Sequence, residues 1–109
     1  MSKYHSRKTT LDGQTFDSRR EAHRYAELKL MERAGLISDL QTQVKFELVP
    51  RQRKPSGGVE RAVTYTADFV YTTADGIKVV EDTKGVRTQQ YIIRRKLMLW
   101  VHGIEVREI

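Results

Sequence analysis

The chain has 109 residues, of which 39% are hydrophobic and 31% are charged, and it contains no cysteine. This composition is typical of a soluble globular protein in a reducing cytoplasm, and it excludes disulfide frameworks, thiolate metal sites and, for want of a long apolar run, membrane spans. Twenty Lys and Arg against 14 Asp and Glu leave a net charge of +6, which favours a polyanionic partner such as DNA or RNA.

The N-terminal third begins with a polar, basic segment that has no apolar signal core. We expect residues 1–9 to be a basic flexible arm and residues 10–16 to form a small hairpin. A helix is predicted over residues 18–34, because Ser18 and Glu21 have the spacing of a capping box. The rest of the chain, residues 10–109, is predicted to be a single domain.

Extended segments dominate the middle of the chain. Alternating apolar and charged residues predict a strand over 36–49, and glycine and proline predict a basic loop over 51–61. Two further strands, 62–73 and 77–84, are separated by a short turn that contains Asp75 and Gly76.

A second helix is predicted from Thr88, as N-cap, to His102, followed by a final strand over 103–109. Its apolar side is predicted to comprise Ile93, Leu97, Trp100 and Val101. The element order is therefore αβββαβ, an α/β fold in which the second helix is the crossover that brings the last strand into the sheet in parallel.

The predicted hairpin carries an acidic residue on one strand and an Asp-x-Lys triplet on the other. A three-residue loop would place Asp68 directly opposite Asp82, whereas a two-residue loop would place it opposite Thr83 with the carboxylates on different faces. Asp82 and Lys84 share a face because side chains alternate along a strand. Two facing carboxylates repel each other, and a bound divalent cation would remove that cost.

The Asp68, Asp82 and Lys84 constellation resembles the PD-(D/E)xK nuclease superfamily, with Ala67 in place of the proline. The sequence pattern ADF…VVEDTKG…GIEV is also similar to that of small phage-encoded proteins described as endonucleases, over roughly residues 11–109. This resemblance implies a restriction-endonuclease-like αβββαβ core, a mixed central sheet flanked by helices, and the host cytoplasm as location.

The resemblance also implies roles for individual residues. Asp68, Asp82 and the carbonyl of Thr83 would be ligands of Mg²⁺ or Mn²⁺, which prefer hard oxygen donors. Lys84 would contact the attacking water or the scissile phosphate. Glu21 would reach the metal from the first helix, although its capping-box position accounts for it equally well.

The acidic residues also admit roles outside metal binding. Lys84 between two acids could be a surface salt bridge only, but exposed pairs contribute too little to explain such placement. Glu81 competes with Asp82 as the ligand; it lies on the opposite strand face from Lys84, so we expect an exposed or helix-paired acid. Tyr65 and Tyr71 are predicted to be core residues on the strand face opposite Asp68.

Two basic clusters are predicted to contact nucleic acid, one on the 51–61 loop and one at the start of the second helix, whose free backbone N–H groups attract phosphate. These residues are Arg51, Arg53, Lys54 and Arg61 on the loop, and Gln89, Arg94, Arg95 and Lys96 on the helix. The loop cluster could equally be a solvated basic face, and this alternative is slightly weaker for the helix cluster.

We therefore expect a divalent-metal-dependent endodeoxyribonuclease, structure-selective toward branched or junction DNA in phage recombination or processing. Junction resolvases of the superfamily are similarly small, basic and dimeric, so the resemblance also admits a homodimer. The alternative is a non-catalytic nucleic-acid-binding module on the same fold. A third, weaker alternative is a structural or partner-binding protein whose DNA affinity would hardly depend on salt.

Overall fold

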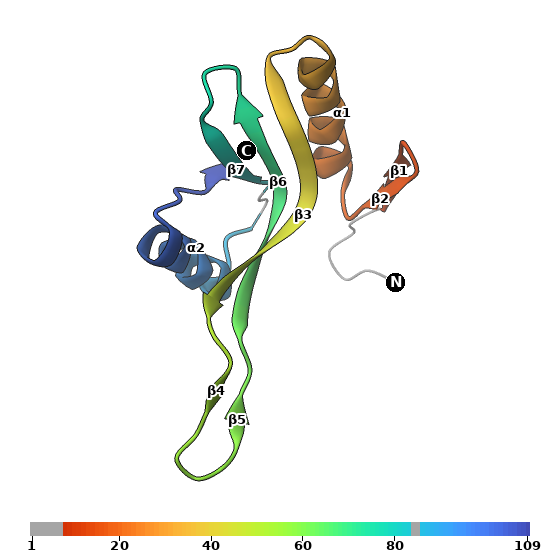
Figure 1. The fold of residues 1–109 in the computed structure, drawn as a ribbon. Coiled ribbons are helices and arrows are strands. Elements are labelled where there is room, and N and C mark those ends of the chain that lie inside the picture. Colours follow the sequence, from red (N-terminus) through yellow and green to blue (C-terminus); the bar gives the residue numbers. More distant parts are fainter. Residues whose placement is uncertain (1–7, 84–85) are drawn as a thin grey trace. The chain divides into compact units, whose positions relative to one another are not determined.

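The computed structural model describes residues 8–83 and 86–109 (Figure 1). Most of the predicted arm and Lys84, the last residue of the Asp-x-Lys triplet, lie outside these residues. Neither helix of the described part is long and apolar enough to span a membrane.

The structure has the predicted order of elements, and its main sheet is mixed. Four strands pair in the order β3-β6-β7-β8, and the last two are parallel, with Asp82 opposite Glu108. The main elements are α1 (Arg19–Arg33), β3 (Ile37–Val49), β6 (Val63–Thr73), β7 (Lys78–Asp82), α2 (Gln89–His102) and β8 (Arg107–Glu108). The predicted α/β class and the parallel crossover through the second helix are confirmed.

Contacts along the chain cluster into two compact units. One holds the residues up to Leu40 together with Tyr71–Lys78, and the other holds Gln41–Val70 together with Val79–Ile109. Strands β3, β6 and β7 contribute residues to both units. The expectation of a single domain over 10–109 stays a prediction.

The first unit is built around α1 and a small antiparallel hairpin of β1 (Thr9–Leu11) and β2 (Gln14–Phe16). The ring of Phe16 packs against Tyr25 of α1 at a centroid distance of 4.9 Å. The Ser18 hydroxyl accepts a hydrogen bond from the Glu21 amide at 3.1 Å, so the predicted N-cap is confirmed. Leu28 of α1 is fully buried.

The turn between β6 and β7 matches the three-residue alternative. The amide of Thr73 donates to the carbonyl of Ile77 at 2.8 Å, so these two residues face each other across the turn. Gly76 adopts a positive φ of 85°, a conformation that side-chain-bearing residues rarely adopt. The strand after the turn is shorter than predicted, since β7 ends at Asp82 rather than at residue 84.

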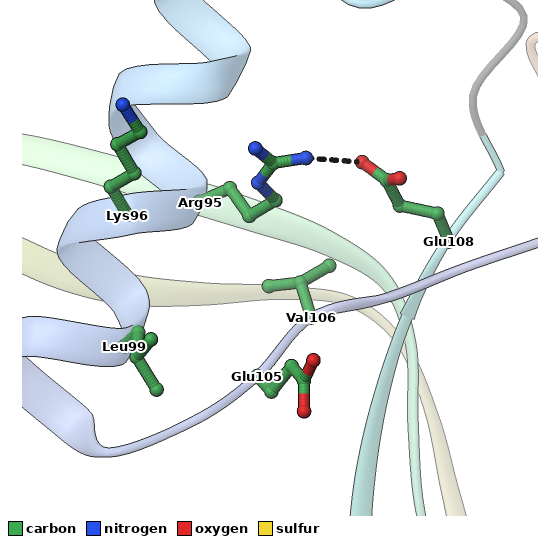
Figure 2. Close-up of a pocket in the computed structure, with 6 residues that line it drawn as sticks. All are labelled: Arg95, Lys96, Leu99, Glu105, Val106 and Glu108. Carbon is green, nitrogen blue, oxygen red and sulfur yellow. Dashed lines mark hydrogen bonds and ion pairs between the residues drawn. The ribbon is translucent and has the colours of Figure 1, made fainter.

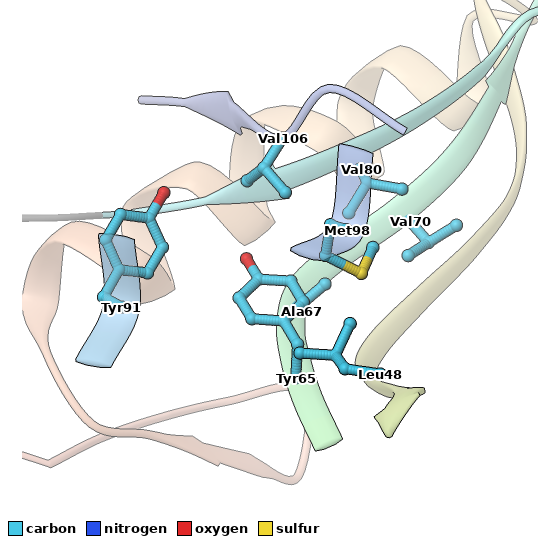
Figure 3. Close-up of a cluster of buried hydrophobic side chains, with 8 residues drawn as sticks. All are labelled: Leu48, Tyr65, Ala67, Val70, Val80, Tyr91, Met98 and Val106. Carbon is cyan, nitrogen blue, oxygen red and sulfur yellow. The ribbon is translucent and has the colours of Figure 1, made fainter. Parts of the chain in front are cut away.

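The second unit has a hydrophobic cluster between α2 and the sheet (Figure 3). Its buried members are Leu48, Tyr65, Ala67, Val70, Val80, Tyr91, Met98 and Val106. The predicted apolar side of α2 is wrong in large part, because Ile93, Trp100 and Val101 are exposed and the helix buries Tyr91 and Met98 instead. The N-cap Thr88 and the left-handed C-cap Gly103 are as predicted.

The basic segment 51–61 is more ordered than the predicted loop. Two short strands, β4 (Gln52–Arg53) and β5 (Val59–Glu60), pair antiparallel and extend the β3–β6 hairpin (Figure 1). The amide of Lys54 closes the turn by donating to the carbonyl of Gly58 at 2.7 Å. Pro55 and the two glycines therefore shape a hairpin tip rather than an unpaired loop.

Candidate functional site

The structure brings the side chain of Asp68 to Thr83, just after the end of β7. Oxygen Oδ2 of Asp68 accepts two hydrogen bonds from Thr83, one from the backbone amide at 2.8 Å and one from the hydroxyl at 2.7 Å. β7 ends at Asp82, and the amide of the next residue, Thr83, donates to a side chain. The first acid of the predicted motif is thereby tied to the residue that follows the second acid.

Asp82 is almost completely buried, and its partner is a tyrosine from β6. Its Oδ2 accepts a short hydrogen bond from the Tyr65 hydroxyl. Burial and this hydrogen bond raise the pKa of Tyr65 far above its ordinary value, and the charges of Asp82, Tyr91 and Asp68 add to the shift. Tyr65 therefore stays a neutral donor, and its hydroxyl lies within electrostatic reach of both carboxylates.

A second tyrosine–carboxylate pair lies beside the first. Tyr91 of α2 donates its hydroxyl to Oε2 of Glu108 at 2.7 Å, and the rings of Tyr65 and Tyr91 are 6.4 Å apart. Figure 3 shows both phenol rings among the buried side chains of the second unit. Two arginines complete this second pair, with Arg87 at 2.9 Å from Glu108 Oε1 and Arg95 at 3.2 Å from Oε2.

Glu81 and Glu21, the other two acids considered from the sequence, are both buried. Glu81 is fully buried on β7, so the expectation of an exposed acid is wrong. Glu21 is also buried, and it belongs to the first compact unit, whereas Asp68 and Asp82 belong to the second. Its amide is capped by Ser18. The metal-contacting role of Glu21 and the role of Lys84 stay predictions.

A hard divalent cation would need oxygen donors from the predicted set, Asp68, Asp82 and the Thr83 carbonyl. Oδ2 of Asp68 is bonded to Thr83, and Oδ1 accepts no hydrogen bond from the described residues. Within residues 8–83 and 86–109, no group of three or more His, Asp or Glu side chains could hold a metal ion. Mg²⁺ is commonly bound through one or two carboxylates together with water, and the metal-ligand roles of Asp68, Asp82 and Thr83 stay predictions.

Some of the residues predicted to contact nucleic acid are exposed, and others are bonded to groups within the fold. Those on the β4–β5 hairpin are all exposed, and Lys54 is in a 3.3 Å ion pair with Glu60. On α2, Gln89 and Lys96 are exposed, and Arg94 Nε donates to the Thr64 carbonyl at 3.0 Å. Arg95 bonds Glu108 and lies 6.0 Å from the Tyr91 ring centre, so its charge is committed within the fold.

Sequence reasoning missed three residues of this site. Tyr65 was assigned to the core, which is correct for its ring, but its hydroxyl contacts Asp82. Tyr91 and Glu108 were not singled out at all. Glu108 had one available signal, since it lies on the strand predicted to run parallel to the one that ends with the motif.

Comparison with known proteins identifies a family without assigning a function. A family model described as "Protein of unknown function (DUF1064)" matches residues 1–107. No curated protein and no solved structure matches the chain.

Proposed function

The chain belongs to the DUF1064 family, and from the geometry at the end of β7 we propose that it is a divalent-metal-dependent endonuclease that hydrolyses DNA phosphodiester bonds. The observation that carries the proposal is the pair of hydrogen bonds from Thr83 to Asp68. They tie Asp68 of β6 to Thr83, the residue that follows Asp82, which supports the pairing of the two acids that the PD-(D/E)xK resemblance requires.

The surrounding bonds support a site built to keep two carboxylates in place. Thr83 orients Asp68 with two donors, and Tyr65 orients Asp82 with one. These three donors are neutral, so none of them adds a positive charge beside the carboxylates. Outer partners of this kind align metal ligands and increase their affinity for the cation.

Asp68 and Asp82 would hold Mg²⁺ or Mn²⁺, with the Thr83 carbonyl as a further oxygen donor. The cation supplies Lewis-acid stabilisation of the charge that develops on the phosphate oxygens. Lys84 would place its ammonium against the attacking water or the scissile phosphate, and Glu21 would assist from α1. The net charge of +6 and the exposed arginines of the β4–β5 hairpin would hold the polyanion.

Cleavage assays test this proposal. Supercoiled plasmid and a labelled four-way junction are incubated with Mg²⁺, Mn²⁺ or EDTA, using the wild type and Asp68→Asn. The asparagine keeps an oxygen acceptor for Thr83 and loses the charge. We expect metal-dependent cutting that is lost in the variant, and the preferred DNA would show whether the enzyme selects branched structures. Sedimentation of the protein with the junction would show whether it acts as a homodimer.

The second candidate is a nucleic-acid-binding module without catalysis. It is favoured by the small number of acids at the end of β7, where the described residues supply two carboxylates rather than three. Well-folded protein that binds DNA but cuts neither substrate with either metal would establish this alternative and overturn the nuclease.

A further inference from the structure

The second unit has an open pocket of about 320 Å³ between β6 and the start of α2. The residues that line it are Thr64, Tyr65, Thr66, Thr88, Gln90, Tyr91 and Arg94. One is cationic and the others are neutral, so no described carboxylate forms its wall. Tyr65 connects this pocket to the proposed metal site, because its ring lines the pocket while its hydroxyl bonds Asp82.

A second pocket, of about 360 Å³, lies on another side of α2 and has a different electrostatic character (Figure 2). It contains Glu105 and the Arg95–Glu108 ion pair, which Figure 2 shows across its rim. Two cations, Arg95 and Lys96, and two carboxylates, Glu105 and Glu108, line it, so the acids offset the positive charge that an anion would need. Of these two pockets, the one beside Tyr65 is therefore the one that combines a cation with an acid-free wall.

Arg94 is held in that pocket in an orientation that leaves most of its donors available. Its Nε–H donates to the Thr64 carbonyl at 3.0 Å. A guanidinium has five N–H donors in a rigid plane, so four remain on the two terminal nitrogens. One backbone carbonyl therefore fixes the direction of a planar fork whose geometry matches two oxygens of a phosphate.

Neutral donors surround this fork. Thr64 and Thr66 are exposed and two positions apart on β6, so both hydroxyls belong to one strand face. The exposed side-chain amide of Gln90 faces the same pocket from the first turn of α2. The hydroxyl of Thr88 is engaged with the Tyr91 amide at 3.1 Å and is not counted among the ligand donors.

We propose that this pocket binds a backbone phosphate of a nucleic-acid strand, with Arg94 as the charged contact and Thr64, Thr66 and Gln90 as neutral contacts. Tyr65 lines this pocket and also bonds Asp82 of the proposed metal site. The bound phosphate would therefore belong to a nucleotide next to the one that is cleaved. This inference rests on the proposed function and adds the residues that position its substrate. It also separates Arg94 from Arg95, which sequence reasoning grouped together.

Binding measured in EDTA tests the pocket without cleavage. The dissociation constant of a fluorescent DNA duplex is determined at several KCl concentrations for wild type, Arg94→Gln and Arg33→Gln. Arg33 is an exposed residue of α1 that does not line the pocket, so its variant makes the same charge change without altering the pocket wall. We expect Arg94→Gln to weaken binding several-fold and to reduce the slope of log affinity against log salt by about 0.9, the value for one phosphate contact. Arg33→Gln should keep the wild-type slope.

The inference is overturned if folded Arg94→Gln keeps the wild-type slope, or if both variants lose affinity equally. It is also overturned if millimolar inorganic phosphate displaces the duplex at matched ionic strength, because the pocket would then hold free phosphate. Cleavage in Mg²⁺ is scored separately. If the wild type cuts DNA but Arg94→Gln keeps the wild-type salt slope, the phosphate pocket is rejected and the nuclease stands. If the salt slope depends on Arg94 but the wild type does not cut DNA, the nuclease is rejected and the pocket stands.

Discussion

Asp82 and Glu108 face each other on two parallel strands, yet their surroundings differ. Each accepts a hydrogen bond from a tyrosine, Asp82 from Tyr65 and Glu108 from Tyr91. Asp82 is 1% exposed, whereas the side chain of Glu108 is 20% exposed and contacts two arginines. Carboxylates on neighbouring strands thus have different surroundings, because arginines contact Glu108 and a neutral phenol contacts Asp82.

The difference separates a structural acid from a candidate ligand. The charge of Glu108 is balanced by arginines, so it ties α2 to β8 and has little to offer a cation. Asp82 accepts a hydrogen bond from a neutral phenol, and Asp68 accepts two from Thr83. Under the proposed function, a cation bound by both aspartates would balance their charges.

The largest expected effect comes from exchanging each carboxylate for its amide. Asp82→Asn keeps the shape and an acceptor for Tyr65 but loses the charge, so we expect plasmid cleavage to fall by more than about 100-fold, the upper range for losing an outer partner alone. Glu108→Gln is the matched control and should cut at a rate close to wild type. Equal losses in the two variants would remove the distinction between the acids.

Removing the tyrosine hydroxyl beside each acid, in separate variants, should again impair cleavage at Asp82 only, by a smaller amount. Tyr65→Phe leaves Asp82 without its orienting donor, and we expect the Mn²⁺ concentration for half-maximal cleavage to rise about 10- to 100-fold. Tyr91→Phe removes the corresponding donor from Glu108 and should leave that concentration unchanged. Metal titrations of both variants make the measurement, and a shift in Tyr91→Phe alone would contradict the assignment of Asp82.

The pH dependence of stability tests the other half of the comparison. The hydrogen bond from Tyr91 and the contacts with Arg87 hold the pKa of Glu108 below its ordinary value. The unfolded chain therefore binds more protons in this range, so the stabilisation is complete above about pH 4.3, the unfolded pKa, and is lost as the pH falls through the folded pKa. Glu108→Gln should cost about 1–2 kcal/mol at pH 7 and little at pH 3, in urea unfolding at both values.

The smallest effect should come from the cap of the helix that carries Tyr91. Thr88 accepts a hydrogen bond from the Tyr91 amide, so Thr88→Ala should lower the free energy of unfolding by about 1 kcal/mol. Ser18→Ala, which removes the equivalent cap of α1, is the control with a similar expected cost. Urea unfolding of both variants makes the measurement, and an unchanged stability in Thr88→Ala would contradict the role of this cap.

The prediction of α2 succeeded at its ends and failed on its faces. Thr88 and Gly103 mark the helix because capping is a local property of the backbone. Its apolar residues surround the helix, so spacing alone permitted a face through Ile93, Leu97 and Trp100. The sheet instead selected the face of Tyr91 and Met98, which places the Tyr91 hydroxyl on Glu108 and leaves Trp100 85% exposed.

The amino-acid sequence by itself determined the order of the elements, the caps of both helices, the three-residue loop as one of two turn geometries, and Asp68 and Asp82 as the acids to consider. These follow from local backbone preferences and from side-chain alternation. Only the tertiary structure decided which turn forms, where β7 ends, and that Tyr65 bonds Asp82 while Glu108 captures Arg95. Those bonds join residues from different elements, and local spacing carries no information about which distant partner a side chain will meet.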